Sequence, residues 1–436
     1  MIPFIKIFGL NTFSVRIPMT LVGCISLFVF YKLLRKIVNE KYAIIGLTFF
    51  AICPWHVMKS RWGLESNLFP DLILWFLYLL VEGVENKNKL IYYLSFVVAG
   101  ISAYAYGTSY YFLPCFIIPT LIVLIKQKKI SIWQALVSIL IVGIVSLPII
   151  MYVIINTFDL PQLNLPFMTI PKLEVNRYME LTSIFSGSFF ATCWENLKQG
   201  IMIFILQYDG LPWNSIYPCG TIYIFSILFL IIGLIDSIRK NKVVQAKYEF
   251  IINIWFIVSL LLVLICEPNI NRINICFIPI IYYVVKGIYI SVQNKKMYLY
   301  IISFMYVAFF MLFIYKYINQ DFNEYGTFEA GLEEAIQYVD TINDKPIYIT
   351  NKIKSNYIYV LFYTKYNTNN FVDTVQYLDN NVEFRVVKSF GKFNFQIEKK
   401  FDIIKDNVYV LKKEEKERYN LDGYSVKEFD KYIVVE

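Results

Sequence analysis

An arginine set among asparagines, Asn271-Arg272-Ile-Asn274, is the sharpest chemical signal in the sequence. The guanidinium of arginine carries a permanent charge and a planar fork of donors, which suits a phosphate or pyrophosphate group. We therefore predict that Arg272 and Asn271 bind a donor phosphate. The alternative is a loop clamp in which Arg272 pairs with Glu267, five residues earlier in the chain.

A second polar stretch follows Pro54 and carries Lys59, Arg61 and Glu65. We predict that Arg61 helps to hold a donor phosphate and that Glu65 lies on the acceptor side of a cavity. Because Arg61 and Glu65 are four residues apart, they could instead pair with each other on one helical turn. Asp71 begins the next apolar run and suits both an acidic helix cap and a catalytic carboxylate.

Four further residues are candidates for the acceptor side of the cavity. Three of them follow the short apolar run Ile201–Leu206 and would face a cavity if that run re-enters the membrane. The fourth lies in a tyrosine-rich turn, which is typical of an interfacial aromatic belt but would also serve as a sugar-binding surface. These four are Asp209, Trp213, Asn214 and Tyr106.

Histidine and cysteine usage argues against a zinc or iron–sulfur centre. His56 is the single histidine of the sequence, and the seven cysteines form no CxxC pair and no metal-ligand spacing. Cys193 and Cys219 both fall in predicted outer loops, where a disulfide between them would be permitted.

All of these residues require a membrane framework to position them. The 436-residue chain is 57% hydrophobic and 17% charged, which is unlike a soluble domain. Apolar runs long enough to cross about 30 Å of hydrocarbon recur before residue 318. They predict about ten transmembrane helices, near residues 15–31, 42–58, 68–82, 90–106, 109–125, 133–155, 220–238, 249–266, 274–290 and 298–317.

The orientation of this polytopic α-helical membrane protein follows from the basic residues of alternate loops, which mark the cytoplasmic side. The residues that we assign to that side are Lys32, Arg35, Lys36, Lys41, Lys87, Lys89, Lys126, Lys128, Lys129, Arg239, Lys240, Lys242, Lys247, Lys286, Lys295 and Lys296. Both termini are then expected outside. Met1–Arg16 is amphipathic and is predicted to lie as a helix in the outer interface. The long outer loop 156–198 carries Arg177 and Glu180 among its charges.

The sequence pattern changes near residue 318. Thr327–Ile342 has the apolar period of an amphipathic helix, and Asn356–Tyr366 could form a second one. Strands are predicted at Pro346–Thr350, Val382–Val387 and Val408–Leu411. We therefore expect a membrane domain over 1–317 and a C-terminal extracytoplasmic α/β domain over 318–436, which is large enough to bury a core.

Charge is divided unequally between these two parts. From residue 318 onward there are 16 Lys and Arg against 20 Asp and Glu, and before it 25 against 13. The basic excess of the membrane part is explained by its topology, so it does not indicate binding of nucleic acid.

The order of these pieces resembles the protein O-mannosyltransferase and aminoarabinose-transferase family of the GT-C superfamily. The matching stretches are Ile7-Phe-Gly-Leu-Asn-Thr-Phe-Ser-Val-Arg-Ile-Pro18, Pro54-Trp-His with Ser60-Arg61, and Asn271-Arg-Ile-Asn274 with Pro279. The resemblance covers most of residues 1–317 and rests on the order of short motifs and on topology.

The resemblance implies an enzyme of the plasma membrane, inverting, of the hexosyl- or pentosyltransferase type. Such an enzyme transfers a sugar from a polyprenyl-phosphate donor to an acceptor on the outer face, and a divalent cation or basic residues hold the donor phosphate. Membrane lipid and the polyprenyl-phosphate-linked sugar are then the expected partners, and no nucleic acid is expected.

The sequence departs from that family at its N-terminus. In the family, a helix and an outer loop that carries the catalytic Asp precede the Phe-Gly to Arg-Ile-Pro segment, and this sequence begins after that point. The catalytic residue is therefore unknown, and loss of a general base typically costs about 10²–10⁴-fold in rate. Two alternatives accompany the glycosyltransferase hypothesis: a non-catalytic accessory subunit of a partner transferase, and a transporter or flippase of lipid-linked glycans.

Overall fold

The computed structural model describes the whole chain except residues 175–178, 180, 181, 186, 240, 294, 295, 320–327, 343, 344, 380, 381, 383 and 397–402. The chain divides into two compact units. The larger, here the membrane unit, comprises Met1, Phe13–Lys172 and Arg177–Gln320. The other, here the C-terminal unit, comprises Asp321–Glu436 together with Ile2–Thr12 and Leu173–Asn176.

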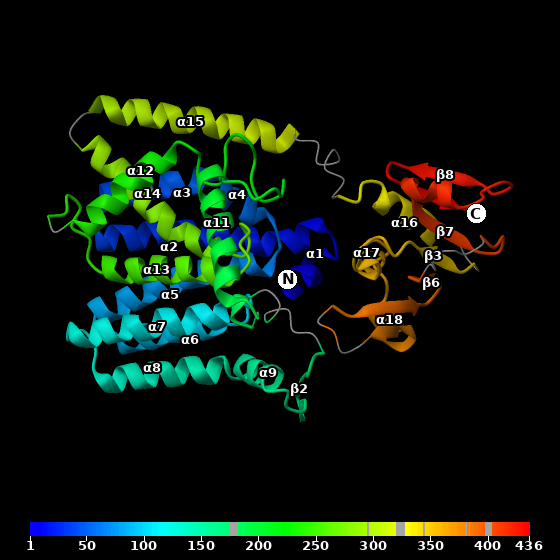
Figure 1. Ribbon diagram of the computed structural model, residues 1–436, viewed down its shortest axis with the longest axis horizontal. Coiled ribbons are helices and arrows are strands. Elements are labelled where there is room, and N and C mark those ends of the chain that lie inside the picture. The colour runs from blue at the N-terminus through cyan, green and yellow to red at the C-terminus, as the bar shows by residue number, and fades with distance from the viewer. Residues whose placement is uncertain are drawn as a thin grey trace. The chain divides into compact units, whose positions relative to one another are not determined.

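The membrane unit is built almost entirely from helices (Figure 1). In chain order they are α2 (Thr12–Ile37), α3 (Glu40–Ile52), α4 (Pro54–Arg61), η1 (Glu65–Asn67), α5 (Leu68–Glu85), α6 (Lys89–Ser102), α7 (Ser109–Lys126), α8 (Ile132–Val145), α9 (Leu147–Thr157), η2 (Ser183–Phe185), α11 (Phe189–Leu206), α12 (Ser226–Ile238), α13 (Glu249–Ile265), η3 (Asn274–Cys276), α14 (Phe277–Val292) and α15 (Lys296–Asn319). A hairpin of β1 (Leu163–Leu165) and β2 (Met168–Ile170) follows α9.

The helices fit a multi-pass membrane protein, but the count of ten spans is not confirmed. Among the described residues, five helices are long and apolar enough to cross a membrane, or up to seven if each of two bent pairs is one span. The bent pairs are α3 with α4, at 57°, and α8 with α9, at 70°. The spans predicted at 90–106, 220–238 and 249–266 correspond to the shorter apolar helices α6, α12 and α13.

Loops that were predicted to share one side of the membrane meet at one end of the membrane unit. Lys36 and Lys247 place their Nζ atoms 3.9 and 4.0 Å from the carboxylate of Glu85, at the end of α5. Lys129 lies 3.4 Å from the ring centroid of Tyr248. The loops after α2, α5, α7 and α12, which carry basic residues, therefore meet at this end of the membrane unit. Two of the basic residues in the prediction, Lys240 and Lys295, lie outside the described residues.

Lys286 was wrongly counted among the loop residues. It is fully buried in α14, where its Nζ lies 2.5 Å from Glu249 of α13 and 3.1 Å from Asp236 of α12. Lys242 also pairs with Glu249, at 2.6 Å. Two cations thus offset two carboxylates, because an unpaired charge inside a membrane protein is costly. Lys286 joins three helices to one another instead of marking the cytoplasmic side.

One local prediction was also wrong. Met1–Arg16 does not form one amphipathic helix, because α1 (Ile2–Phe8) ends at Gly9, whose φ of +74° is the left-handed conformation that stops a helix. Arg16 lies instead in α2. The apolar run Ile201–Leu206 is the last part of the 18-residue helix α11, and its re-entry into the membrane stays a prediction.

The C-terminal unit contains a mixed seven-stranded sheet with the strand order β4-β5-β6-β3-β7-β9-β8. β3 runs parallel to β6 and β7, and the other pairs are antiparallel. Its elements are α16 (Leu332–Asp340), β3 (Ile347–Ile349), α17 (Asn356–Tyr363), α18 (Thr368–Thr374), β4 (Gln376–Asp379), β5 (Val386–Phe390), β6 (Phe393–Asn394), β7 (Val408–Lys412), η5 (Lys413–Arg418), β8 (Val426–Phe429) and β9 (Tyr432–Val435).

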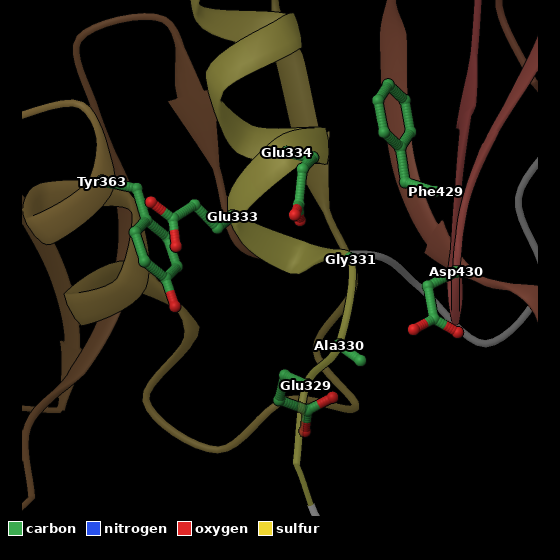
Figure 2. A pocket seen from close by; sticks show the side chains of 8 residues that line it. All are labelled: Glu329, Ala330, Gly331, Glu333, Glu334, Tyr363, Phe429 and Asp430. Carbon is green, nitrogen blue, oxygen red and sulfur yellow. The ribbon is translucent and has the colours of Figure 1, made fainter. Parts of the chain in front are cut away.

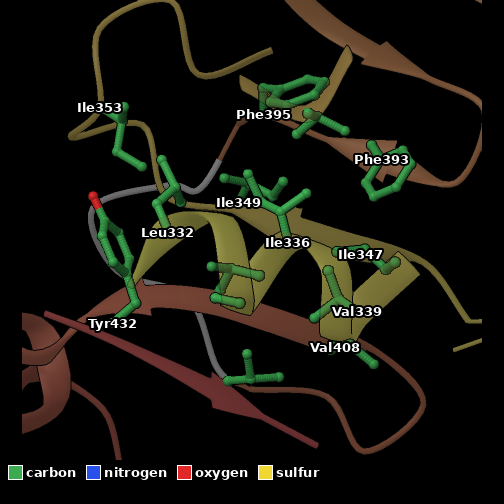
Figure 3. Close-up of a cluster of buried hydrophobic side chains, with 14 of the residues drawn as sticks. Leu332, Ile336, Val339, Ile347, Ile349, Ile353, Phe393, Phe395, Val408 and Tyr432 are labelled. Atoms are coloured by element: carbon green, nitrogen blue, oxygen red, sulfur yellow. The ribbon is translucent and has the colours of Figure 1, made fainter. Parts of the chain in front are cut away.

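The apolar face of α16 closes the core of this unit against the sheet (Figure 3). Leu332, Ile336 and Val339 recur at helical spacing and are fully buried beside Ile347 of β3 and Val408 of β7. The amphipathic helix predicted over 327–342 is thus confirmed for 332–340, and the strands predicted at 346–350 and 408–411 correspond to β3 and β7. The strand predicted at 382–387 overlaps β5 only at its end, and residue 383 lies outside the described residues.

Candidate functional site

A buried ion pair lies where α4 ends and α5 begins. The Nζ of Lys59 is 2.5 Å from Oδ2 of Asp71, and the two side chains are 2% and 0% exposed. Lys59 occupies the last turn of α4, and Asp71 occupies the first turn of α5. The ammonium of Lys59 also lies 4.9 Å from the ring centroid of Trp55. Neither charge could stay this deeply buried without the other.

Three buried polar atoms without a hydrogen-bond partner lie on the ion pair itself and on the neighbouring turns η1 and η3. Among the described residues, Oδ1 of Asp71, Oγ of Ser66 and Oδ1 of Asn274 have no hydrogen-bond partner. Asn274 donates through Nδ2 to the carbonyl of Ser66 at 2.7 Å, so η3 meets η1. Buried polar atoms are normally hydrogen-bonded, and several exceptions in one region indicate a place where a polar ligand could bind.

Arg272 forms the loop clamp that the alternative interpretation predicted. Its Nη1 lies 2.6 Å from Oε2 of Glu267 and donates to the Glu267 carbonyl at 3.1 Å. The Arg272 side chain is 17% exposed, whereas that of Glu267 is 62% exposed. Ion pairs of this exposed kind contribute about 0–1 kcal/mol, so an incoming phosphate could displace the Glu267 carboxylate. Phosphate binding by Arg272 stays a prediction.

The structure brings three of the predicted site residues together from two loops. Asn214 donates to Oδ2 of Asp209 at 2.7 Å, and Asn271 donates to Oδ1 of Asn214 at 2.7 Å. Asp209 also accepts the backbone N–H groups of Ile270, at 2.9 Å, and Leu211, at 3.1 Å. A carboxylate with three donors is fixed in place. Asp209 therefore joins the loop after α11 to the loop before η3.

The remaining predicted site residues lie in separate surroundings. The guanidinium of Arg61 is 5.0 Å from the ring centroid of Tyr317 in α15. Arg61 and Glu65 form no ion pair with each other, because α4 ends at Arg61 and Glu65 begins η1. Trp213 and Tyr106 are half-buried in the turns after α11 and before α7. From the predicted outer loop, Arg177 and Glu180 lie outside the described residues.

Cys193 and Cys219 do not form the disulfide that their predicted loops would permit. All seven are free, with Sγ of Cys193 3.3 Å from Oγ of Ser183 and Cys219 buried. Within the described part of the chain, no three His, Cys, Asp or Glu side chains come together as metal ligands. Mg²⁺ is commonly held by one or two carboxylates plus substrate phosphates, so this observation leaves a divalent cation open.

A separate pocket of about 490 Å³ lies in the C-terminal unit at the start of α16 (Figure 2). Its lining includes four carboxylates and two aromatic rings, those of Glu329, Glu333, Glu334, Asp430, Tyr363 and Phe429. Two of the carboxylates occupy the first turn of α16, where the helix dipole favours negative charge. Because the pocket is acidic, it does not suit a phosphate group.

Comparisons with known proteins relate this chain to membrane sugar transferases. Residues 3–156 match the family described as dolichyl-phosphate-mannose-protein mannosyltransferase. Among solved structures, ArnT from Cupriavidus metallidurans bound to undecaprenyl phosphate matches with a TM-score of 0.55 and 9% identity, covering 100% of this chain and 86% of that chain. The apo state of the same ArnT matches with a TM-score of 0.45 and 11% identity, covering 100% and 85%. No curated protein matches the sequence.

These matches confirm the resemblance that the sequence predicted. The likeness to the ligand-bound ArnT shows a shared fold, and at 9% identity it shows the fold alone. The family match includes Lys59 and Asp71 but ends before Arg272. The buried ion pair therefore lies in the part of the chain that both comparisons cover.

Proposed function

We propose that the chain is a membrane glycosyltransferase that moves a sugar from a polyprenyl-phosphate donor to an acceptor. The ArnT structure that shares the fold contains undecaprenyl phosphate, and the family matched by residues 3–156 takes its name from a dolichyl-phosphate-linked mannose. The structural observation that carries the proposal is the buried pair of Lys59 and Asp71, with an Asp71 oxygen that has no partner in the described structure.

In this proposal Asp71 is the residue that meets the reacting hydroxyl group. Its Oδ2 is held by Lys59, whereas its Oδ1 is buried on the side of Ser26 and would accept a hydrogen bond from an acceptor only after the site opens to admit it. A fixed carboxylate placed in this way can take the proton of the hydroxyl as it attacks the sugar. Asp71 would then supply the general base that the family resemblance could not assign to this sequence.

The donor phosphate is assigned to Arg272, with Asn271 and Arg61 as further donors. The hydrogen bond from Asn274 to Ser66 brings the loop of Arg272 to the segment between α4 and α5. A phosphate there would exchange the single carboxylate on Arg272 for a forked contact. The predicted acceptor-side residues Glu65, Asp209, Trp213, Asn214 and Tyr106 would line the approach, with Asp209 holding the loops together.

The reaction is assigned to the outer face of the membrane. Asp71 and Glu85 lie at opposite ends of α5, and Glu85 contacts the basic residues Lys36 and Lys247. Because basic loops mark the cytoplasmic side, the end of α5 that carries Asp71 would face outward. In this proposal, the C-terminal unit is also extracytoplasmic.

The proposal is tested with the full chain in lipid nanodiscs, with undecaprenyl phosphate as the probe of the donor site. Binding is measured by native mass spectrometry, and turnover by release of labelled sugar from polyprenyl-phosphate sugars. Wild type is expected to bind, and Arg272→Ala to bind at least about tenfold more weakly, since about 1.4 kcal/mol corresponds to that factor. The double variant Lys59→Met/Asp71→Leu, which leaves no unpaired charge, is expected to keep binding and lose turnover.

Lys198→Ala serves as the matched control, because the contacts of Lys198 with Glu195 and with the ring of Trp194 are exposed and stay within α11. It should behave as wild type in both assays. Equal binding by Arg272→Ala and wild type would remove Arg272 from the site. Binding without turnover of any tested donor, together with copurification of a second transferase, would favour the accessory-subunit alternative.

A further inference from the structure

The helix α9, which follows α8, is bent by 70° relative to it. The 14 residues of α8 rise about 21 Å, which is short of the roughly 30 Å of a hydrocarbon core. Because α9 is bent by 70°, its 11 residues advance only about 6 Å further along the α8 axis and travel about 15 Å across it. With α8 along the membrane normal, α9 runs almost parallel to the membrane boundary.

One face of α9 exposes a stripe of apolar side chains. Leu147, Ile150, Ile154 and Phe158 are spaced by three and four residues, and all are exposed. Phe158, just after the helix, is 71% exposed. On the opposite side Asn156 is buried and donates to the carbonyl of residue 171 at 3.0 Å, which fixes α9 to the end of the hairpin.

The hairpin extends this apolar surface. β1 and β2 pair antiparallel, and Leu165 of β1 is exposed. Phe167 in the connecting turn is 81% exposed. The charges at the base of the hairpin compensate each other, because Lys172 lies 2.8 Å from Asp159. The surface therefore presents large apolar groups and little net charge.

We propose that residues 147–170, here the α9–hairpin segment, lie on the outer leaflet and bind the surface of the phospholipid bilayer. The segment continues the lipid-facing side of α8, whose Leu136, Leu140 and Ile144 are exposed. Apolar helix faces of this kind settle at the boundary between headgroups and acyl chains, where aromatic residues are enriched. Since α8 starts near the basic Lys129, α9 lies toward the opposite leaflet. This inference holds whether or not the chain transfers sugar.

The test introduces the photoreactive p-benzoylphenylalanine at single positions of the full chain. Phe158 and Phe167 are replaced in the α9–hairpin segment, and Leu140 in α8 is replaced as the lipid-facing reference. Val372 in α18 of the C-terminal unit is replaced as an exposed reference outside that segment. The proteins are reconstituted in vesicles of radiolabelled phosphatidylcholine, with or without phosphatidylglycerol, and irradiated. Because the replaced side chains are exposed, the variants should fold normally.

Lipid labelling at 158 and 167 is expected to lie within about twofold of labelling at 140, and well above that at 372. Because Asp159 and Lys172 compensate each other, phosphatidylglycerol should not change it. Labelling at 158 and 167 as low as at 372 would overturn the proposal. Labelling that requires phosphatidylglycerol, or capture of a protein chain in place of lipid, would overturn it as well.

Discussion

At the Lys59–Asp71 pair, the stability of the fold and the proposed chemistry depend on the same two side chains. Asp71→Ala leaves the ammonium of Lys59 buried without a counter-charge, which typically costs about 3–5 kcal/mol. The double variant Lys59→Met/Asp71→Leu removes both charges and should recover most of that loss, although it should remain inactive. Denaturant unfolding in detergent measures the stabilities. If the double variant is as unstable as Asp71→Ala, the hydrogen bond and the packing of the two side chains must stabilise the fold in addition to their mutual neutralisation.

The clamp between Glu267 and Arg272 gives a second prediction at this scale. Glu267→Ala frees the guanidinium of Arg272, so undecaprenyl phosphate should bind up to about fivefold more tightly, which corresponds to about 1 kcal/mol. Arg272→Lys keeps the charge but loses the fork, and binding should weaken. Titration of nanodiscs by native mass spectrometry measures both. If Glu267→Ala binds as weakly as Arg272→Ala, the clamp is needed to shape the loop.

The sequence predicted some of these residue contacts and not others. The pairing of Glu267 with Arg272 was foreseen only as the alternative to phosphate binding, because the two residues are five positions apart in one loop. Lys59 and Asp71 were both noticed, but their pairing was not predicted, since eleven residues, among them Trp62 with extended backbone, lie between them. No helical or strand period relates two such positions. Their contact depends on the path of the chain between the end of α4 and the start of α5.

Between elements, α12 and α14 approach so closely that only glycine fits. A Cβ atom on Gly233 would clash with the carbonyl oxygen of Tyr283, and one on Gly287 with that of Phe229. Such close backbone approach is common between membrane helices with small interface residues. Gly287→Leu should therefore force α12 and α14 apart and cost at least about 1–3 kcal/mol. Thermal unfolding in detergent measures the loss.

Gly143 in α8 provides the matched control for that substitution. A Cβ atom added there would meet open space, since no neighbouring atom of the described residues comes within 4 Å of it. Gly143→Leu should therefore change the unfolding temperature little. Leucine favours the helix over glycine, so equal losses for Gly143→Leu and Gly287→Leu would mean that the contact of α12 with α14 does not set the cost.

The membrane helices were predictable where a helix coincides with one long apolar run of the sequence. The runs at 109–125, 274–290 and 298–317 correspond to α7, α14 and α15. The bends were not predicted, although Pro54 and Pro148 mark the starts of α4 and α9. Hydropathy averages over a window, so it does not separate a straight helix from a bent pair. The helix α11 was missed because Glu195 and Lys198 interrupt its apolar run.

For the whole molecule, the change in composition near residue 318 indicated where the membrane helices end. The predicted helices and strands in the C-terminal part followed from local periodicity. The order of the seven strands could not follow from it, because β3 pairs with β6 and β7, which lie far along the chain. Short strands such as β6, with two residues, also carry too little pattern to be detected.

The C-terminal unit should fold without the membrane helices. Its sheet and α16 enclose a core of their own, in which Leu332, Ile336 and Val339 are fully buried. A fragment of residues 328–436 expressed in water is therefore expected to unfold cooperatively in urea. Ile336→Asp places an unpaired charge in that core and should prevent folding. Ile358→Asp, at an exposed position of α17, should be tolerated. A fragment that lacks a cooperative transition, or equal effects of the two substitutions, would mean that this core depends on the rest of the chain.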